Sequence, residues 1–99
     1  MIKHIVLFQM KAFSTEEEKQ EKLKNLKRGL ESLDGKIPGL LSIEVGININ
    51  PAEQYDLALT TTFSSMSDLH AYAIHPEHMA VAVKIREVLE KRACVDFEY

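Results

Sequence analysis

The segment of residues 2–10 limits most strongly how this chain can fold. It is too short for a helix of normal length and is rich in β-branched and aromatic residues, so it is predicted to be a strand. Successive side chains of a strand point to opposite faces. Val6 and Phe8 therefore share one face, Ile5 and Leu7 share the other, and both faces are apolar. Each face of the sheet that holds this strand must be covered.

The length of 99 residues fits one domain, which we expect to span residues 1–99, because one hydrophobic core typically serves roughly 100–150 residues. Hydrophobic residues make up 45% of the chain and charged residues 27%, the proportions of a globular protein rather than of a disordered or fibrous one. So small a domain has a thin core, and pairing with another chain would add buried surface.

A helix is predicted after the first strand. Ser14 or Thr15, followed three residues later by a glutamate, has the pattern of a capping box, which marks the start of a helix. Gly35 suits the left-handed cap at the end of a helix. Between these positions, leucines at offsets of three and four form one apolar stripe; they are Leu23, Leu26, Leu30 and Leu33.

The rest of the chain is predicted to contain three strands and two helices. Apolar and polar residues alternate in the second strand, and a turn joins it to the third, so these two strands form a hairpin. Ser67 is expected to cap a short helix, and Pro76 to lie in the first turn of another, where its missing N–H costs nothing. The predicted strands cover residues 40–49, 55–63 and 94–99, and the last helix runs to about residue 91.

The order strand, helix, strand, strand, helix pair, strand predicts an α+β fold, with a four-stranded antiparallel sheet and helices on one face. The helices suffice to cover only that face. Because the first strand is apolar on both faces, we predict a homodimer in which a second protomer covers the open sheet face.

The net charge of −3, from 15 acidic and 12 basic residues, and the lack of a basic stripe argue against binding to nucleic acid. The apolar run of residues 5–8 is far shorter than the ~20 residues that span a bilayer, and no secretory cleavage pattern follows it. We therefore expect a cytoplasmic protein without a membrane partner. Cys94, the only cysteine, has no partner for a disulfide or at zinc-motif spacing, and it is interpreted as a small buried hydrophobic residue.

Residues 72–78, Tyr-Ala-Ile-His-Pro-Glu-His, form the only motif specific enough to suggest chemistry. If Pro76 bends the chain, the Tyr72 phenol and the His78 imidazole can both project between the helices and the sheet. An imidazole of pKa ~6.5 can take or give a proton near neutral pH, and a tyrosine can stabilise a developing enolate by hydrogen bonding. The alternative is that both residues only pack and cap helices.

Two further histidines, His75 and His4, are expected to have other roles. His75 precedes a proline, which restricts it to extended conformations and favours a helix-capping role. Together with Glu77 and His78 it lacks the spacing of the zinc helix motif, so we predict no metal site and no cofactor. His4 lies on an apolar strand face and needs a hydrogen-bond partner or a pocket, so it is either a satisfied core histidine or a pocket residue.

Several segments together resemble the stress-responsive dimeric A/B barrel (Dabb) family. They are residues 2–8, the turn at 37–39, the strand at 55–63, the motif at 72–78 and Asp96. The resemblance covers nearly the whole chain. It implies a ferredoxin-like βαββαβ protomer whose sheet packs against that of its partner to form a dimeric α/β barrel.

Within that family, the motif resembles that of a plant polyketide cyclase, which catalyses an intramolecular aldol condensation. The resemblance implies that His78 removes a proton next to a carbonyl, that Tyr72 positions this carbonyl, and that His4 lines the pocket. The chain departs from the cyclase at Leu57, where the cyclase has a second strand histidine, and at Arg92 and Cys94, which replace aliphatic residues. The substrate of the cyclase is therefore not implied.

Two functions stay open at this point. The first is an enzyme or binding protein for a small apolar or carbonyl-containing ligand, with Tyr72 and His78 as catalytic residues. Its candidate pocket residues are His4, Val6, Phe8, Leu57, Leu59, His75 and Val81. The second is a noncatalytic dimeric domain of unassigned activity, in which the same residues fasten the helix break to the sheet. An oxygenase acting on quinol-like or haem substrates is disfavoured, because the chain has no tryptophan and no haem-ligand pattern.

Overall fold

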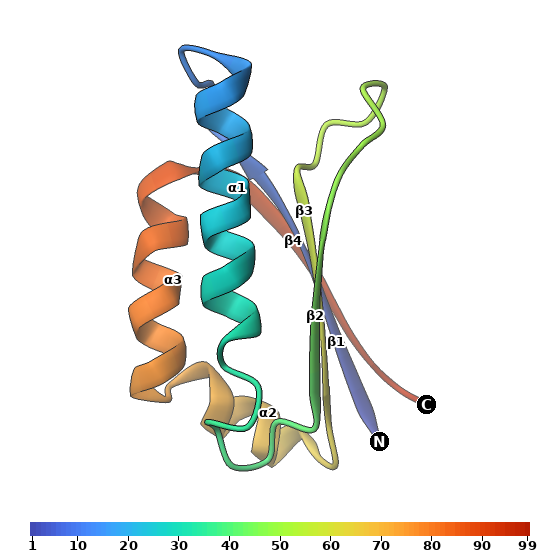
Figure 1. The fold of residues 1–99 in the computed structure, drawn as a ribbon. Coiled ribbons are helices and arrows are strands. Elements are labelled where there is room, and N and C mark those ends of the chain that lie inside the picture. The colour runs from blue at the N-terminus through green and yellow to red at the C-terminus, as the bar shows by residue number, and fades with distance from the viewer.

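Four antiparallel strands form one sheet in the computed structural model, which describes residues 1–99 (Figure 1). The strands stand in the order β2, β3, β1, β4, so β1 pairs with β3 on one side and with β4 on the other. The elements in chain order are β1 Ile2–Met10, α1 Glu16–Glu31, β2 Ser42–Ile47, β3 Leu57–Phe63, α2 Met66–Ala73, α3 Pro76–Val88 and β4 Leu89–Glu98. This architecture confirms the predicted α+β, ferredoxin-like fold.

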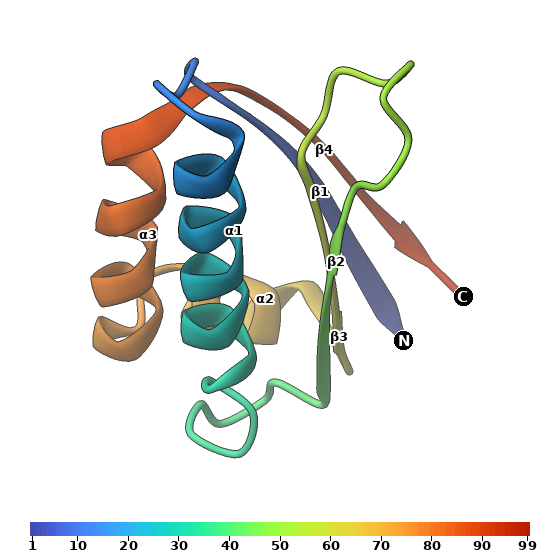
Figure 2. The ribbon, with the colours of Figure 1, turned by 45° about the horizontal axis from the view of Figure 1, so that its top comes forward.

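All three helices lie on one face of the sheet (Figures 1 and 2). α1 and α3 run side by side across this face, and a sharp bend joins α2 to α3 at one end of the helical layer. No helix covers the other face, where the strand register gathers mostly apolar side chains in adjacent rows. These side chains belong to Ile5, Leu7, Ala58, Ala93, Val95 and Phe97.

The start of α1 follows the predicted capping pattern. Thr15 has an extended backbone, and its side-chain oxygen accepts a hydrogen bond of 3.1 Å from the backbone N–H of Glu18. Three glutamates occupy the first turn, where the helix dipole favours negative charge. The predicted leucine stripe then faces the sheet and is buried, which anchors the helix over the core.

The end of α1 and the start of α2 differ from the prediction. α1 ends at Glu31 rather than near Gly35, because the following residues form tighter turns in which the amide of Lys36 donates to the carbonyl of Leu33. Gly35 itself has the expected left-handed backbone, with a φ of 78°. α2 is capped by Ser65 and not by Ser67, since the Ser65 backbone is extended and its hydroxyl accepts from the third helical amide.

The strands also differ from the predicted ranges. β2 and β3 are shorter, because their pairing stops at Ile47 and Leu57 and the asparagine-rich segment between them forms its own side-chain turns. α3 ends at Val88 and β4 begins directly at Leu89, five residues before the predicted start. β4 starts this early because it pairs along the whole of β1 as far as Met10.

The core fills the space between the sheet and the helices with 17 buried hydrophobic residues. β1 contributes Ile2, Val6, Phe8 and Met10 to it, all on one face of the strand because side chains alternate. His4 is the single polar side chain in that series, and it is half-buried among Ile2, Val6 and Phe8. This position places an imidazole at the wall of the core.

We expect Gly39→Ala to destabilise the fold more than Gly35→Ala. Both glycines have a positive φ, which costs an alanine about 1–2 kcal/mol. A Cβ atom at Gly39 would also lie 3.0 Å from the Cβ of Asp68, whereas one at Gly35 meets nothing within 4 Å. Urea unfolding measures the two losses in free energy of unfolding, and equal losses would mean that Asp68 moves aside freely.

Candidate functional site

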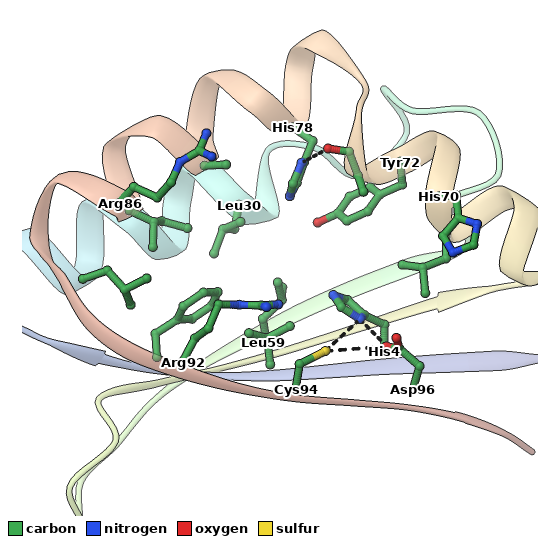
Figure 3. A pocket seen from close by; sticks show the side chains of 17 residues that line it. His4, Leu30, Leu59, His70, Tyr72, His78, Arg86, Arg92, Cys94 and Asp96 are labelled. Atoms are coloured by element: carbon green, nitrogen blue, oxygen red, sulfur yellow. Dashed lines mark hydrogen bonds and ion pairs between the residues drawn. The ribbon is translucent and has the colours of Figure 1, made fainter.

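A cavity of about 470 Å³ lies between the helical layer and the sides of β1 and β4 that face it (Figure 3). Most of its lining side chains are hydrophobic. It remains open because α3 packs beside α1 and does not close over β4, whose residues after Leu89 are all exposed. An apolar hollow with a few polar groups is the usual form of a small-molecule site.

Tyr72, from the last turn of α2, forms part of the wall of this cavity. Its side chain is 1% exposed and packs between the rings of Phe63 and His78, whose centroids are 5.2 and 4.4 Å from its own. The hydroxyl points into the cavity and has no hydrogen-bond partner (Figure 3). Burial raises the pKa of Tyr72 to about 12, so the phenol stays neutral near neutral pH. An unpaired buried hydroxyl can bind a polar group of a ligand.

His78, in the first turn of α3, is oriented by the helix break. The Nδ1 atom lies 3.0 Å from the carbonyl oxygen of Ala73 at the end of α2. Since a carbonyl can only accept, Nδ1 carries the hydrogen, and Nε2 of the neutral ring holds a free lone pair. Burial lowers the pKa of His78, so the neutral form prevails near neutral pH. Nε2 is therefore available as a base.

The break itself depends on His75 and Pro76. The backbone of His75 is extended, as expected before a proline, and its Nδ1 accepts a hydrogen bond of 3.1 Å from the amide of Glu77. This caps α3, as predicted, and occupies the ring nitrogen that faces the helix. The carbonyl of Ala73 lies at the end of α2 and receives no hydrogen bond from a helical amide, so it can accept one from His78.

His4 forms a second polar cluster on the opposite wall, together with two residues of β4. The register pairs His4 with Asp96 and Val6 with Cys94, so both β4 side chains face the cavity beside the imidazole. Nδ1 of His4 contacts Oδ1 of Asp96 and lies 3.5 Å from Sγ of Cys94, which in turn lies 3.7 Å from Oδ1 of Asp96. The nitrogen, sulfur and carboxylate oxygen atoms of these three side chains all lie within 4.8 Å of one another.

The prediction for Cys94 was wrong. It was expected to be a buried hydrophobic residue, but it is exposed, because it lies on the edge strand where no helix covers the sheet. Partial desolvation and the neighbouring Asp96 carboxylate raise the pKa of its thiol, so the group is protonated near neutral pH.

The predicted site residues are divided between the cavity and its surroundings. The cavity wall includes His4, Val6, Phe8, Leu59, Tyr72 and His78. Three other candidates do not line the cavity, because each has a different structural role. Leu57 is buried in the core near the start of β3, His75 caps α3, and Val81 faces Gly29 of α1.

Five polar residues of the wall were not among the candidates: His70, Arg86, Arg92, Cys94 and Asp96. Arg92, Cys94 and Asp96 alternate along β4, so they share one face of that strand. The predicted strand began at residue 94 and therefore left out Arg92. A strand that begins at residue 89 places all three side chains on one face. His70 and Arg86 carry no comparable signal, because helix spacing alone does not show which side faces a cavity.

The sequence of the chain matches the Stress responsive A/B Barrel Domain (Dabb) family over residues 2–99. The chain belongs to the Dabb family. No curated protein matches the sequence of this Dabb protein. None of its three helices has the length and apolar character that crossing a membrane requires.

Solved structures similar to this Dabb protein support the same assignment. A dimeric protein of unknown function with a ferredoxin-like fold from Bacteroides fragilis is 42% identical, with a TM-score of 0.92 over 99% of this chain and 95% of that one. A dimeric ferredoxin-like protein of unknown function from Thermobifida fusca is 27% identical, with a TM-score of 0.84 over 99% and 90%. A Dabb family protein with a ferredoxin-like fold from Mesorhizobium loti is 26% identical, with a TM-score of 0.73 over 99% and 95%.

We expect Tyr72→Phe to raise the stability of the fold. The phenyl ring keeps the packing against Phe63 and His78, while the cost of burying an unpaired hydroxyl, about 1 kcal/mol or more, disappears. Tyr99→Phe serves as the matched control, because Tyr99 is exposed and its change should be close to neutral. Chemical unfolding measures both variants, and a loss of stability in Tyr72→Phe would show that the hydroxyl is bonded in solution.

Proposed function

We propose that the cavity binds a small, mostly apolar compound that carries a carbonyl group. The observation that carries this proposal is the Tyr72 hydroxyl, which is buried, unpaired and directed into an apolar hollow. A neutral phenol donates a hydrogen bond well to a carbonyl oxygen. The apolar lining would hold the rest of the ligand by desolvation.

We further propose that His78 moves a proton next to this carbonyl. Its Nε2 would take a proton from the adjacent carbon, the electrons of the broken C–H bond would pass into an enolate, and Tyr72 would stabilise the enolate oxygen. The 4.4 Å between the two ring centroids supports joint action on one small ligand. The low pKa of His78 favours return of the proton, to the same carbon or to another atom.

This chemistry is that of a polyketide-cyclase-like lyase catalysing aldol condensation or proton transfer. If the resemblance to olivetolic acid cyclase holds, its tyrosine and histidine correspond to Tyr72 and His78, and its first-strand histidine corresponds to His4. The substrate is expected to differ, because Leu57 is buried in the core where that cyclase has a histidine, and Arg92 and Cys94 bring polar groups to the wall.

A noncatalytic dimeric domain is the second candidate function. The hydrogen bond from His78 to Ala73 and the cap by His75 do fasten the helix break, as that hypothesis requires. They use only one nitrogen of the His78 ring. The free Nε2 atom and the unpaired Tyr72 hydroxyl are what favour a ligand.

We also propose that the chain forms a homodimer through its open sheet face. Without a partner the apolar rows on that face stay in water, since Val95 is 53% and Phe97 41% exposed in the single chain. The similar proteins from Bacteroides fragilis and Thermobifida fusca are both described as dimeric. A second copy of the chain is therefore the occupant that the comparisons support.

We expect the wild-type protein to catalyse deuterium uptake at the carbon next to the carbonyl of an aryl methyl ketone in D2O, as measured by proton NMR. His78→Gln should lower the catalysed rate at least a hundredfold, since general base catalysis contributes about 10²–10⁴. The matched control is His75→Asn, which keeps a good helix cap outside the cavity and should leave the rate unchanged. An unchanged rate in His78→Gln excludes His78 as the base.

The pH dependence of this rate has a defined sign. Arg86, His75 and His4 are the neighbouring cationic or titratable groups; all three, when charged, add to the effect of burial in lowering the pKa of His78. The base is active when neutral, so the rate should persist as the pH falls through 6.5 and decline only at a lower pH.

We expect Val95→Lys to weaken the dimer at least tenfold, because it would bury an unpaired charge between the two sheets. Val83→Lys on α3 is the matched control, since Val83 is similarly exposed, at 48%, but lies on the helical layer. Sedimentation velocity measures both variants. A wild-type protein that stays monomeric at micromolar concentration contradicts the proposed dimer.

A further inference from the structure

We propose that His4, Cys94 and Asp96 form a binding site for a divalent transition-metal ion, with Zn²⁺ as the best match, on the β4 wall of the cavity. The proposal concerns the cluster opposite Tyr72 and His78 (Figure 3). It does not depend on the proposed proton transfer.

The distances within the cluster are those of a ligand set. The Nδ1, Sγ and carboxylate oxygen atoms all lie within 4.8 Å of one another. Zn²⁺ bonds of about 2.0–2.3 Å place neighbouring ligand atoms about 3.3–3.8 Å apart in a tetrahedron. The sulfur already lies 3.5 Å from the nitrogen and 3.7 Å from the oxygen. Only the contact between His4 and Asp96 has to widen, and the Asp96 side chain is partly exposed and can rotate.

The connectivity excludes the main alternative, a catalytic cysteine triad. In such a triad the nucleophile and the carboxylate contact opposite nitrogens of the imidazole, so that a proton can pass along the chain of groups. Here the sulfur of Cys94 and the oxygen of Asp96 both approach Nδ1 of His4. The three atoms form a closed triangle, which suits a shared ion and not a relay.

The donor types select the metal. Thiolate, imidazole and carboxylate together are typical ligands of Zn²⁺, whereas Ca²⁺ and Mg²⁺ take oxygen ligands. The thiolate and the carboxylate would neutralise the charge of a dication. All three side chains come from adjacent paired strands, so the backbone already holds them on one face.

A second observation points to a ligand in the same cavity. The Tyr72 hydroxyl is unpartnered, almost fully buried and directed into this cavity. Three protein ligands leave the fourth position of a tetrahedral zinc ion to water or to a ligand. In this cavity that position would face the space that Tyr72 lines.

The test is a titration of the metal-free protein with Co²⁺, followed by absorption spectroscopy, and with Zn²⁺, followed by calorimetry. We expect one ion per chain, a thiolate-to-cobalt charge-transfer band and release of the Cys94 proton on binding. Cys94→Ser should remove the band and weaken binding at least tenfold, and Asp96→Asn should also weaken it. His70→Gln is the matched control, because His70 lines the cavity outside the cluster.

Arg92 supplies a further variant. It lines the same wall as Cys94, and its positive charge opposes a bound cation. Arg92→Gln should therefore tighten Zn²⁺ binding.

Co²⁺ binding without the charge-transfer band, equal affinity in Cys94→Ser and wild type, or no saturable Zn²⁺ binding at micromolar concentration would overturn the metal site. None of these results would affect the ketone exchange assay of His78, so the two proposals fail separately.

Discussion

The pairing of β1 with both β3 and β4 is the constraint on which the fold and the cavity depend. Because side chains alternate along a strand, this register places His4 in one row between Thr61 and Asp96 and sends Ile5 to the opposite face. A shift of β4 by one residue would turn Cys94 and Asp96 away from the helices. The chemistry of that cavity wall therefore follows from backbone pairing, not from loops.

The bend between α2 and α3 combines a structural and a chemical role in a single imidazole. Pro76 starts α3 and His75 caps it, so the carbonyl of Ala73 is left without a helical partner and takes the Nδ1 hydrogen of His78. The same bond turns Nε2 toward the cavity. A structural role and a catalytic role for His78 are therefore compatible, since the structural role uses Nδ1 and the catalytic role would use Nε2.

The sequence was sufficient to predict the family, the fold and the helix cap at His75, because each depends on local patterns or on motifs that span the chain. It could not predict the wall formed by Arg92, Cys94 and Asp96. Strand β4 alternates apolar and polar residues, but its apolar side faces away from the helices, so the alternation alone does not show that the polar side lines a cavity. The placement of Val81 and Arg86 depends on how α3 packs against α1, which no local pattern records.

The exposure of β4 connects the two faces of the sheet. In the single chain nearly every residue of this edge strand is in contact with water, an arrangement that leaves an edge prone to unwanted pairing. A second protomer would cover Val95 and Phe97 on one face, while a ligand or an ion would occupy the space before Cys94 and Asp96 on the other. Because these residues alternate along one backbone, restraining the first face would also hold the ligand groups of the second in place. The proposed dimer would thus contribute to the site without adding a residue to it.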